Sequence, residues 1–157
     1  MTGSHTPDDI FLADADATAG LGARLARTLP QRAVVHLHGD LGAGKSTLAR
    51  AMLRALGVTG TIRSPTYTLV EHYPVAGGGT ALHLDLYRIG DPGELEFLGL
   101  DGDETRLWLI EWPERGQGGL PVADLDIALV VDGDGRRCRL LPRSEAGRAW
   151  LQSMASG

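Results

Sequence analysis

Residues 39–46 of this chain read Gly-Asp-Leu-Gly-Ala-Gly-Lys-Ser and match G-x-x-x-x-G-K-[ST], the pattern of a phosphate-binding P-loop. An apolar run over residues 33–38 precedes the motif, and an amphipathic segment over residues 47–56 follows it and ends at Gly57. This order predicts a strand, a glycine turn and a helix, which is the setting that the motif requires. Glycines let successive backbone N–H groups converge on an anion, and the dipole of the following helix adds positive potential there.

The lysine of the motif, Lys45, is the only lysine in a chain that has 14 arginines. A chance match is the alternative explanation, because 22 glycines make a glycine pattern easy to find. A planar guanidinium would not fit the same cradle as a compact ammonium, so the retained lysine favours a working P-loop. We therefore expect Lys45 to reach the β- and γ-phosphates of a nucleotide and the hydroxyl of Ser46 to bind Mg²⁺.

The bulk properties are those of a globular chain. Its 157 residues, 43% of them hydrophobic, predict one domain over residues 1–157, with residues 1–12 as a loose leader. The net charge of −5 argues against a stand-alone nucleic-acid binder, so any link to RNA is expected to run through a partner. The single Cys138 cannot form an internal disulfide, and no signal peptide or membrane-spanning run is visible, so we expect a cytoplasmic protein.

Helices and hairpins are predicted around the P-loop unit. Three further helices are expected: one from Asp14 or Asp16 to about Leu29, a short one over residues 94–98 that begins with an Asp91–Glu94 capping box and ends at Gly99, and one from Ser144 to about Met154. Two antiparallel hairpins are expected: residues 67–73 with 80–87 at a sheet edge, and residues 125–131 with 136–141 around the turn 132–135. Residues 116–119 are glycine-rich and predict a loop.

Asp85 lies in a strand that alternates cleanly between apolar and polar side chains. One face carries Leu82, Leu84 and Leu86, and the other carries His83, Asp85 and Tyr87. The pattern allows two interpretations. The polar face is either an ordinary solvated face, or it directs Asp85 towards the nucleotide as a carboxylate that serves a metal or a water molecule.

Glu111 ends an apolar run over residues 107–110, and this arrangement has the form of a Walker B element. Such a strand delivers a carboxylate to the edge of the sheet where the Mg²⁺ and γ-phosphate of a P-loop site lie. Many strands end in glutamate, so the run alone says little. Downstream of a P-loop it favours Glu111 as a residue of the site.

In this order and spacing, four segments make the chain resemble the TsaE family, from about Asp14 to the last hairpin. They are the P-loop, Ser64-Pro65-Thr66-Tyr67, His83-Leu84-Asp85-Leu86-Tyr87-Arg88, and Leu109-Ile110-Glu111-Trp112-Pro113. These small bacterial ATPases belong to the pathway that makes N6-threonylcarbamoyladenosine at position 37 of ANN-decoding tRNAs. The resemblance implies an α/β P-loop fold with a mixed central sheet flanked by helices. It also implies Mg²⁺-dependent ATP hydrolysis, weak alone, in the service of a TsaD–TsaB partner complex through which tRNA is reached.

The resemblance also assigns roles to individual residues. It implies catalytic roles for Lys45, Asp85 and Glu111, and metal binding by Ser46, Glu111 and Asp85. It places near the nucleotide Thr18, Gly42, Ala43, Gly44, Lys45, Ser46, Thr47, Trp112 and Arg136. The family usually has threonine after the P-loop lysine, whereas this chain has Ser46; serine also offers a hydroxyl, so we expect the same chemistry.

Two other functions remain open at the level of sequence. A small-molecule kinase would need an acceptor pocket and a late lid that bears arginines; Arg136, Arg137 and Arg139 instead alternate within a predicted strand. A nucleotide-gated binding subunit that barely hydrolyses ATP is not separated from the family role. In either of the ATP-driven roles, residues 64–67 are the expected switch, ordered by an intact γ-phosphate; the alternative is a rigid connecting turn stiffened by Pro65.

Overall fold

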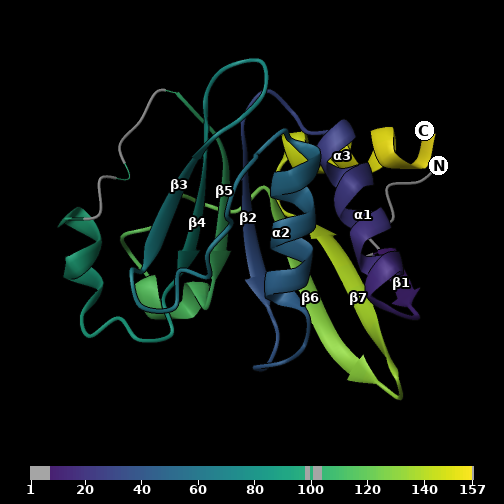
Figure 1. Cartoon of the computed structure of the whole chain (residues 1–157), viewed down its shortest axis with the longest axis horizontal. Helices are drawn as coiled ribbons and strands as arrows, with labels where there is room; N and C mark the ends of the chain where they lie inside the picture. Colours follow the sequence, from purple (N-terminus) through teal and green to yellow (C-terminus); the bar gives the residue numbers. More distant parts are fainter. Residues whose placement is uncertain (1–7, 98–99, 101–103, 157) are drawn as a thin grey trace.

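The computed structural model describes residues 8–97, 100 and 104–156, and Figure 1 shows their arrangement. Its elements in chain order are β1 (Asp8–Leu12), α1 (Ala15–Arg27), β2 (Ala33–His38), α2 (Lys45–Ala55), β3 (Val70–Pro74), β4 (Thr80–Asp85), the 3₁₀ helix η1 (Pro92–Phe97), β5 (Thr105–Glu111), the 3₁₀ helix η2 (Pro113–Gly116), β6 (Leu125–Asp132), β7 (Gly135–Pro142) and α3 (Glu145–Ser156). No helix in these ranges is both long enough and apolar enough to cross a membrane.

The seven strands form one mixed sheet in the order β1-β7-β6-β2-β5-β4-β3. The central strand β2 is parallel to both of its neighbours, β5 and β6, and β4 is parallel to β5. The outer pairs β1–β7, β6–β7 and β3–β4 are antiparallel. The expected α/β fold, with a mixed central sheet flanked by helices and two antiparallel hairpins, is confirmed, and β3 lies at a sheet edge as predicted.

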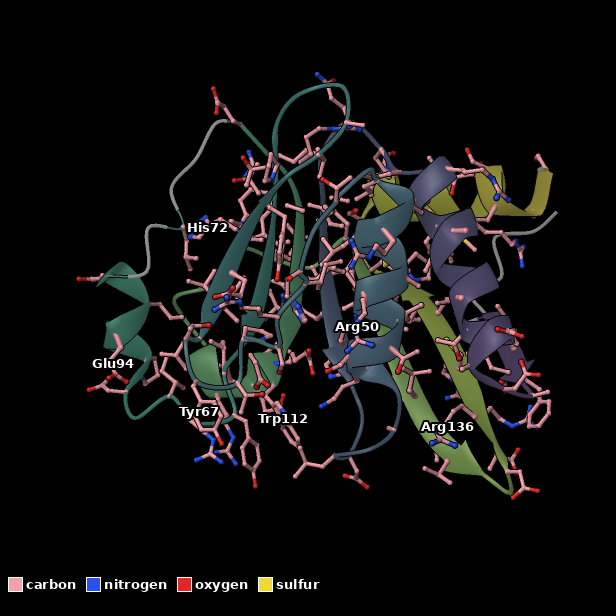
Figure 2. All side chains as sticks on the ribbon, viewed as in Figure 1. Arg50, Tyr67, His72, Glu94, Trp112 and Arg136 are labelled. Atoms are coloured by element: carbon pink, nitrogen blue, oxygen red, sulfur yellow. The ribbon has the colours of Figure 1, made fainter. Side chains whose placement is uncertain are left out.

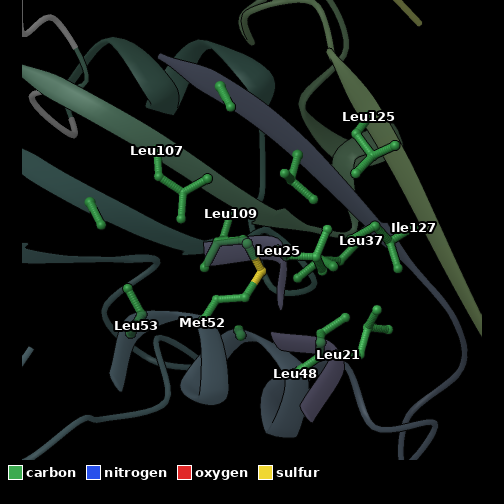
Figure 3. Packing of buried hydrophobic residues seen from close by; sticks show 14 of the residues in the cluster. Leu21, Leu25, Leu37, Leu48, Met52, Leu53, Leu107, Leu109, Leu125 and Ile127 are labelled. Atoms are coloured by element: carbon green, nitrogen blue, oxygen red, sulfur yellow. The ribbon is translucent and has the colours of Figure 1, made fainter. Parts of the chain in front are cut away.

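Helices α1 and α2 pack on one face of the sheet and on each other (Figure 1). Figure 3 shows the resulting core, in which Leu21, Leu25, Leu48 and Met52 of the helices meet strand residues that include Leu37 and Leu109. Helix α3 joins the same core through Trp150, whose indole N–H donates to the backbone carbonyl of Leu25 at 3.1 Å. This core fixes the P-loop helix α2 against the central strands.

A second, smaller core lies on the opposite face of β4 and β5. Leu82, Leu84 and Leu86 pack there with Ile110 and with Leu95 of η1. The β4–β5 part of the sheet is therefore covered on both faces, which is how parallel strands are normally found. The predicted apolar face of the 80–87 strand is thus confirmed as a core face.

The loose leader predicted over residues 1–12 is wrong for residues 8–12, because they form β1 and pair antiparallel with β7. Residues 1–7 lie outside the described residues. Two acidic residues at the start of β1 obscure its strand character, and the strand forms because β7 offers an edge to pair with. The first hairpin also starts later than predicted, at Val70, since residues 65–68 form a turn before Leu69, which has a left-handed φ of 68°.

The predicted helix starts are confirmed, and α1 and α3 end within two residues of the predicted positions, at Arg27 and Ser156. Asp14 accepts a hydrogen bond from the N–H of Ala17 and caps α1, and Ser144 accepts one from Gly147 in the first turn of α3. Glu94 accepts from the N–H of Asp91, as in the expected capping box, although η1 is a 3₁₀ helix and begins at Pro92. The predicted end of this helix, Leu98 and Gly99, lies outside the described residues.

Candidate functional site

The glycine loop joins β2 to α2 and takes backbone shapes that only glycine adopts easily. Gly39, Gly42 and Gly44 have φ values of 148°, 83° and 105°. A Cβ on Gly39 would also lie 2.7 Å from the carbonyl oxygen of Leu129. Gly44 is the N-cap of α2, and no side chain caps that helix end. The first backbone N–H groups of α2 are therefore open to an anion, as a phosphate-binding loop requires.

Lys45 is the first residue of α2 and is only 4% exposed. Its ammonium has no hydrogen-bond partner within the part of the chain that the structure describes, and it lies 4.0 Å from the centre of the Trp112 ring. Burial lowers the pKa of Lys45, while the charges of Glu111 and Asp85 act in the opposite direction. A buried cation without a hydrogen-bonded counter-ion is costly, and an anion bound at the loop would remove that cost.

The two predicted acids end neighbouring parallel strands. Asp85 closes β4 and Glu111 closes β5, and the two residues are directly paired in the strand register. Both are buried, with exposed fractions of 9% and 3%. The interpretation of a solvated polar face is wrong, because His83 on the same face of β4 is buried as well. Since β2 runs parallel to β5, its carboxyl end, from which the P-loop continues, lies at this same edge of the sheet.

His83 is a site residue that the sequence analysis did not single out. Its Nε2 lies 2.6 Å from Oε2 of Glu111, and both side chains are buried. The available signal was its position two residues before Asp85, on the same strand face. Asp85 accepts a hydrogen bond from the backbone N–H of Tyr87 at 3.0 Å.

Trp112 follows Glu111 and leaves the strand with a left-handed φ of 57°. Its ring lies 4.9 Å from that of Tyr87, and the guanidinium of Arg115 lies over both rings. Figure 2 shows Trp112 and the exposed Tyr67 at the same end of the sheet as the P-loop. The structure therefore brings Trp112 to Lys45, as expected for a residue beside the site.

Arg136 and Thr18 were expected near the nucleotide and lie beside the P-loop. Arg136 reaches across from β7 and donates to the backbone carbonyls of Ala43 and Gly42, at 3.1 and 3.2 Å (Figure 2). Together with Thr18, Gly44 and Thr47 it lines a cavity of about 150 Å³. These two hydrogen bonds stabilise the loop through its carbonyl groups.

Mg²⁺ would need oxygen ligands at this edge. No group of three His, Cys, Asp or Glu side chains among the described residues can hold a metal by itself. The hydroxyl of Ser46 and the carboxylates of Asp85 and Glu111 are the hard donors at the end of the P-loop strand and its neighbours. Such a sparse set suits Mg²⁺, which binds through one or two protein oxygens, substrate phosphates and water.

A second polar cluster lies on the opposite face of β2. His38 contacts Asp126 of β6 (Nε2 to Oδ1, 2.9 Å), and Arg143 donates to the other carboxylate oxygen of Asp126. His36 is paired with the carbonyl of Pro121 at 3.2 Å. These four side chains line an open cavity of about 470 Å³, larger than the one beside the P-loop. We call His36, His38, Asp126 and Arg143 the back-face cluster.

Comparison with known proteins identifies the family of this chain. The family described as "Threonylcarbamoyl adenosine biosynthesis protein TsaE" matches residues 12–138. The chain is 47% identical over 125 residues to the tRNA threonylcarbamoyladenosine biosynthesis protein TsaE of Haemophilus influenzae, covering 78% of each chain. It is 34% identical over 134 residues to that of Aquifex aeolicus, covering 84% of this chain and 94% of the relative.

A solved structure shows the same fold. The crystal structure of Bacillus subtilis YdiB superposes with a TM-score of 0.74 over 98% of each chain, at 24% sequence identity. At that identity the likeness supports the architecture, and the sequence matches carry the family assignment. The chain therefore belongs to the TsaE family of tRNA threonylcarbamoyladenosine biosynthesis proteins.

Proposed function

We propose that this protein is a Mg²⁺-dependent ATPase that serves threonylcarbamoyl modification of adenosine 37 in tRNA. The observation that carries the proposal is the buried Lys45 ammonium, which has no hydrogen-bond partner among the described residues and lies at the uncapped start of α2. Each feature alone is a cost to the fold, and an anionic phosphate group relieves both.

In this proposal each residue near the loop has one task. The backbone N–H groups of residues 42–47 bind the phosphates, and Lys45 leaves the Trp112 ring to contact the β- and γ-phosphates. Ser46 and Glu111 would hold Mg²⁺, and the bound cation would supply positive charge beside the phosphates. Asp85, next to Glu111 in the strand register, lies on the metal side and orients the attacking water. The cavity lined by Thr18 and Arg136 is the proposed place of the nucleoside.

Water is the proposed phosphoryl acceptor. The late arginines that a kinase lid would need are part of the sheet: Arg136 binds the P-loop carbonyls, and Arg137 pairs with Asp132 and Asp9. The arginines of β7 therefore do not form the lid that a kinase would need. Hydrolysis without an acceptor substrate points to work on a protein partner, and the family implies a TsaD–TsaB complex, with tRNA reached only through it.

Residues 64–67 are the proposed switch that reports the nucleotide state. The base of this loop is held, because Arg63 donates from its backbone N–H to the Tyr73 hydroxyl at 2.9 Å and accepts a bond from it through its carbonyl. The tip is open, with Tyr67 82% exposed.

Hydrogen exchange should show stronger protection of residues 64–67 with a non-hydrolysable ATP analogue than with ADP. Equal protection in both states, with equal affinity for the partner complex, would mean that the loop is only a connector.

Reconstitution tests the function directly. The purified chain is combined with TsaD, TsaB, ATP, Mg²⁺ and an ANN-decoding tRNA, and both phosphate release and modified adenosine are measured. Lys45→Ala should abolish both, whereas Arg50→Ala, an exposed residue of the same helix, should leave both unchanged (Figure 2). Modification that proceeds normally with folded Lys45→Ala protein would refute the proposed function.

A further inference from the structure

We infer that His83 is a positioning residue that holds the carboxylate of Glu111 in the orientation needed to bind Mg²⁺. This inference rests on the proposed function, because it assigns a task to a neighbour of a proposed metal ligand. It concerns a side chain to which neither the sequence pattern nor the comparisons give a role. The evidence is the hydrogen bond between His83 and Glu111 and the burial of both partners.

The hydrogen bond fixes the chemistry of the ring. Nε2 of His83 lies 2.6 Å from Oε2 of Glu111, and the two side chains are 3% and 4% exposed. A carboxylate can only accept, so Nε2 carries the proton and donates it. Nδ1 has no hydrogen-bond partner in the part of the chain that the structure describes. The hydrogen bond to Glu111 is therefore the only one that the His83 ring makes with the described residues.

The same bond fixes the orientation of the carboxylate. Among the described residues, the contact with Glu111 Oε2 comes from His83 alone, and Oε1 is left for another ligand. The position of His83 relative to Glu111 is well defined, because the two residues lie on the neighbouring parallel strands β4 and β5, whose backbones are hydrogen-bonded to each other. A histidine or carboxylate that orients a metal ligand from behind commonly changes metal affinity or activity about 10- to 100-fold when it is removed.

A purely structural role is the competing explanation. A buried glutamate needs a hydrogen-bond donor, and His83 would then serve stability alone. The two explanations differ in what they predict. A structural role affects the unfolding temperature and leaves metal affinity unchanged in folded protein, whereas a positioning role weakens metal binding even in a variant that folds normally.

Two polar substitutions of nearly equal chemistry separate these explanations. The amide nitrogen of His83→Gln lies near the position of Nε2 and can still donate to Glu111. In His83→Asn it lies near Nδ1 and falls short of the carboxylate. His36→Asn is the matched control, since His36 is half-buried on the adjacent part of the sheet and bonds only a backbone carbonyl on the other face.

The measurement is Mn²⁺ affinity, followed by electron paramagnetic resonance on the full chain with a non-hydrolysable ATP analogue. We expect His83→Asn to weaken Mn²⁺ binding about 10-fold or more, and His83→Gln to stay within about threefold of wild type. Hydrolysis should follow the same order, with kcat reduced in His83→Asn and KM for ATP little changed. His36→Asn should match wild type throughout.

Either of two results would overturn the inference: unchanged Mn²⁺ affinity in folded His83→Asn, or a His83→Gln protein as defective as His83→Asn. If His83→Asn does not fold, the His83→Gln protein decides, because it must keep near-normal Mn²⁺ affinity. Failure of the proposed function is recognised separately, since wild type would then bind no ATP analogue. A third outcome would overturn this inference alone: wild type binds the analogue, Glu111→Gln loses Mn²⁺ affinity, and His83→Asn keeps it.

Discussion

Two polar clusters lie on opposite faces of the central sheet, and each contains a histidine–carboxylate pair and a cation. On the helix-covered face, His83 contacts Glu111 at 2.6 Å near Lys45; on the other, His38 contacts Asp126 at 2.9 Å near Arg143. The back-face cluster even lines the larger cavity. Composition and cavity size alone would therefore favour the back-face cluster over the proposed nucleotide site.

The difference lies in which groups are left without a partner. Arg143 neutralises Asp126, and His38 bonds the same carboxylate, so the charges of the back-face cluster are satisfied within the protein. Lys45 is buried without a hydrogen-bond partner among the described residues, beside a helix end that no side chain caps. We therefore expect the binding site where a buried charge lacks a partner, rather than where polar residues are most numerous.

Neutralising one carboxylate in each cluster should give the largest difference between the two clusters. Glu111→Gln should lower partner-stimulated ATP hydrolysis about 100-fold or more, because the group acts chiefly in the transition state, with a smaller loss of ATP affinity. Asp126→Asn should leave hydrolysis within about twofold, a change typical of a residue away from the chemistry. Steady-state phosphate release checks both, and comparable losses in the two variants would remove the distinction.

A test of smaller effect compares the two cations. Lys45→Met should stabilise the nucleotide-free protein, because the lowered pKa of Lys45 means that its charge is disfavoured in the folded state. We expect an increase in Tm of about 2 to 4 °C, equivalent to about 1 kcal/mol for a domain of this size. Arg143→Met should not raise Tm, since it removes a donor from Asp126. Calorimetry without nucleotide measures both variants. A lower Tm for Lys45→Met would contradict the claim that the buried charge of Lys45 destabilises the nucleotide-free protein.

The smallest expected effects concern pH. Burial lowers the pKa of His36, so the folded state binds fewer protons than the unfolded state below the ordinary histidine pKa of about 6.5. Stability should therefore fall as pH drops from about 6.5 through the lowered pKa, and His36→Gln should flatten this step. Urea titrations between pH 7 and pH 5 give the measurement, and an unchanged slope in His36→Gln would assign the step to another group.

A separate acid step is expected from Asp126. Burial raises the pKa of its carboxyl, but hydrogen bonds from His38 and Arg143 outweigh burial and bring the pKa below its ordinary value. The resulting stabilisation is present above the unfolded pKa of about 3.9 and is lost as pH falls through the lowered value. Asp126→Asn should remove the step in urea titrations below pH 5, and its persistence would contradict the pairing.

The parts of the fold that depend on local pattern could be predicted from the sequence. The glycine spacing before Lys45 and the apolar run before Glu111 identified a strand–loop–helix unit and a neighbouring strand, and the turn at residues 132–135 identified the last hairpin. Each signal lies within about ten residues of chain, where propensity and periodicity are informative.

Contacts that depend on strand order could not be predicted in this way. His83 meets Glu111 only because β4 and β5 pair in parallel across 28 residues of chain. Arg136 reaches the P-loop from 93 residues away, and β1 exists only as the partner of β7. No local pattern encodes which strands become neighbours, so these parts of the site required the three-dimensional arrangement.

An NMR titration tests whether the unmet charge of Lys45 marks the nucleotide site. Backbone amide resonances of the full chain are followed by NMR during titration with Mg²⁺ and a non-hydrolysable ATP analogue. We expect saturable shifts concentrated at residues 39–47, Glu111 and Trp112, with little change at His36, His38 and residues 117–126. Shifts centred on the back-face cluster, with the P-loop amides unmoved, would contradict it.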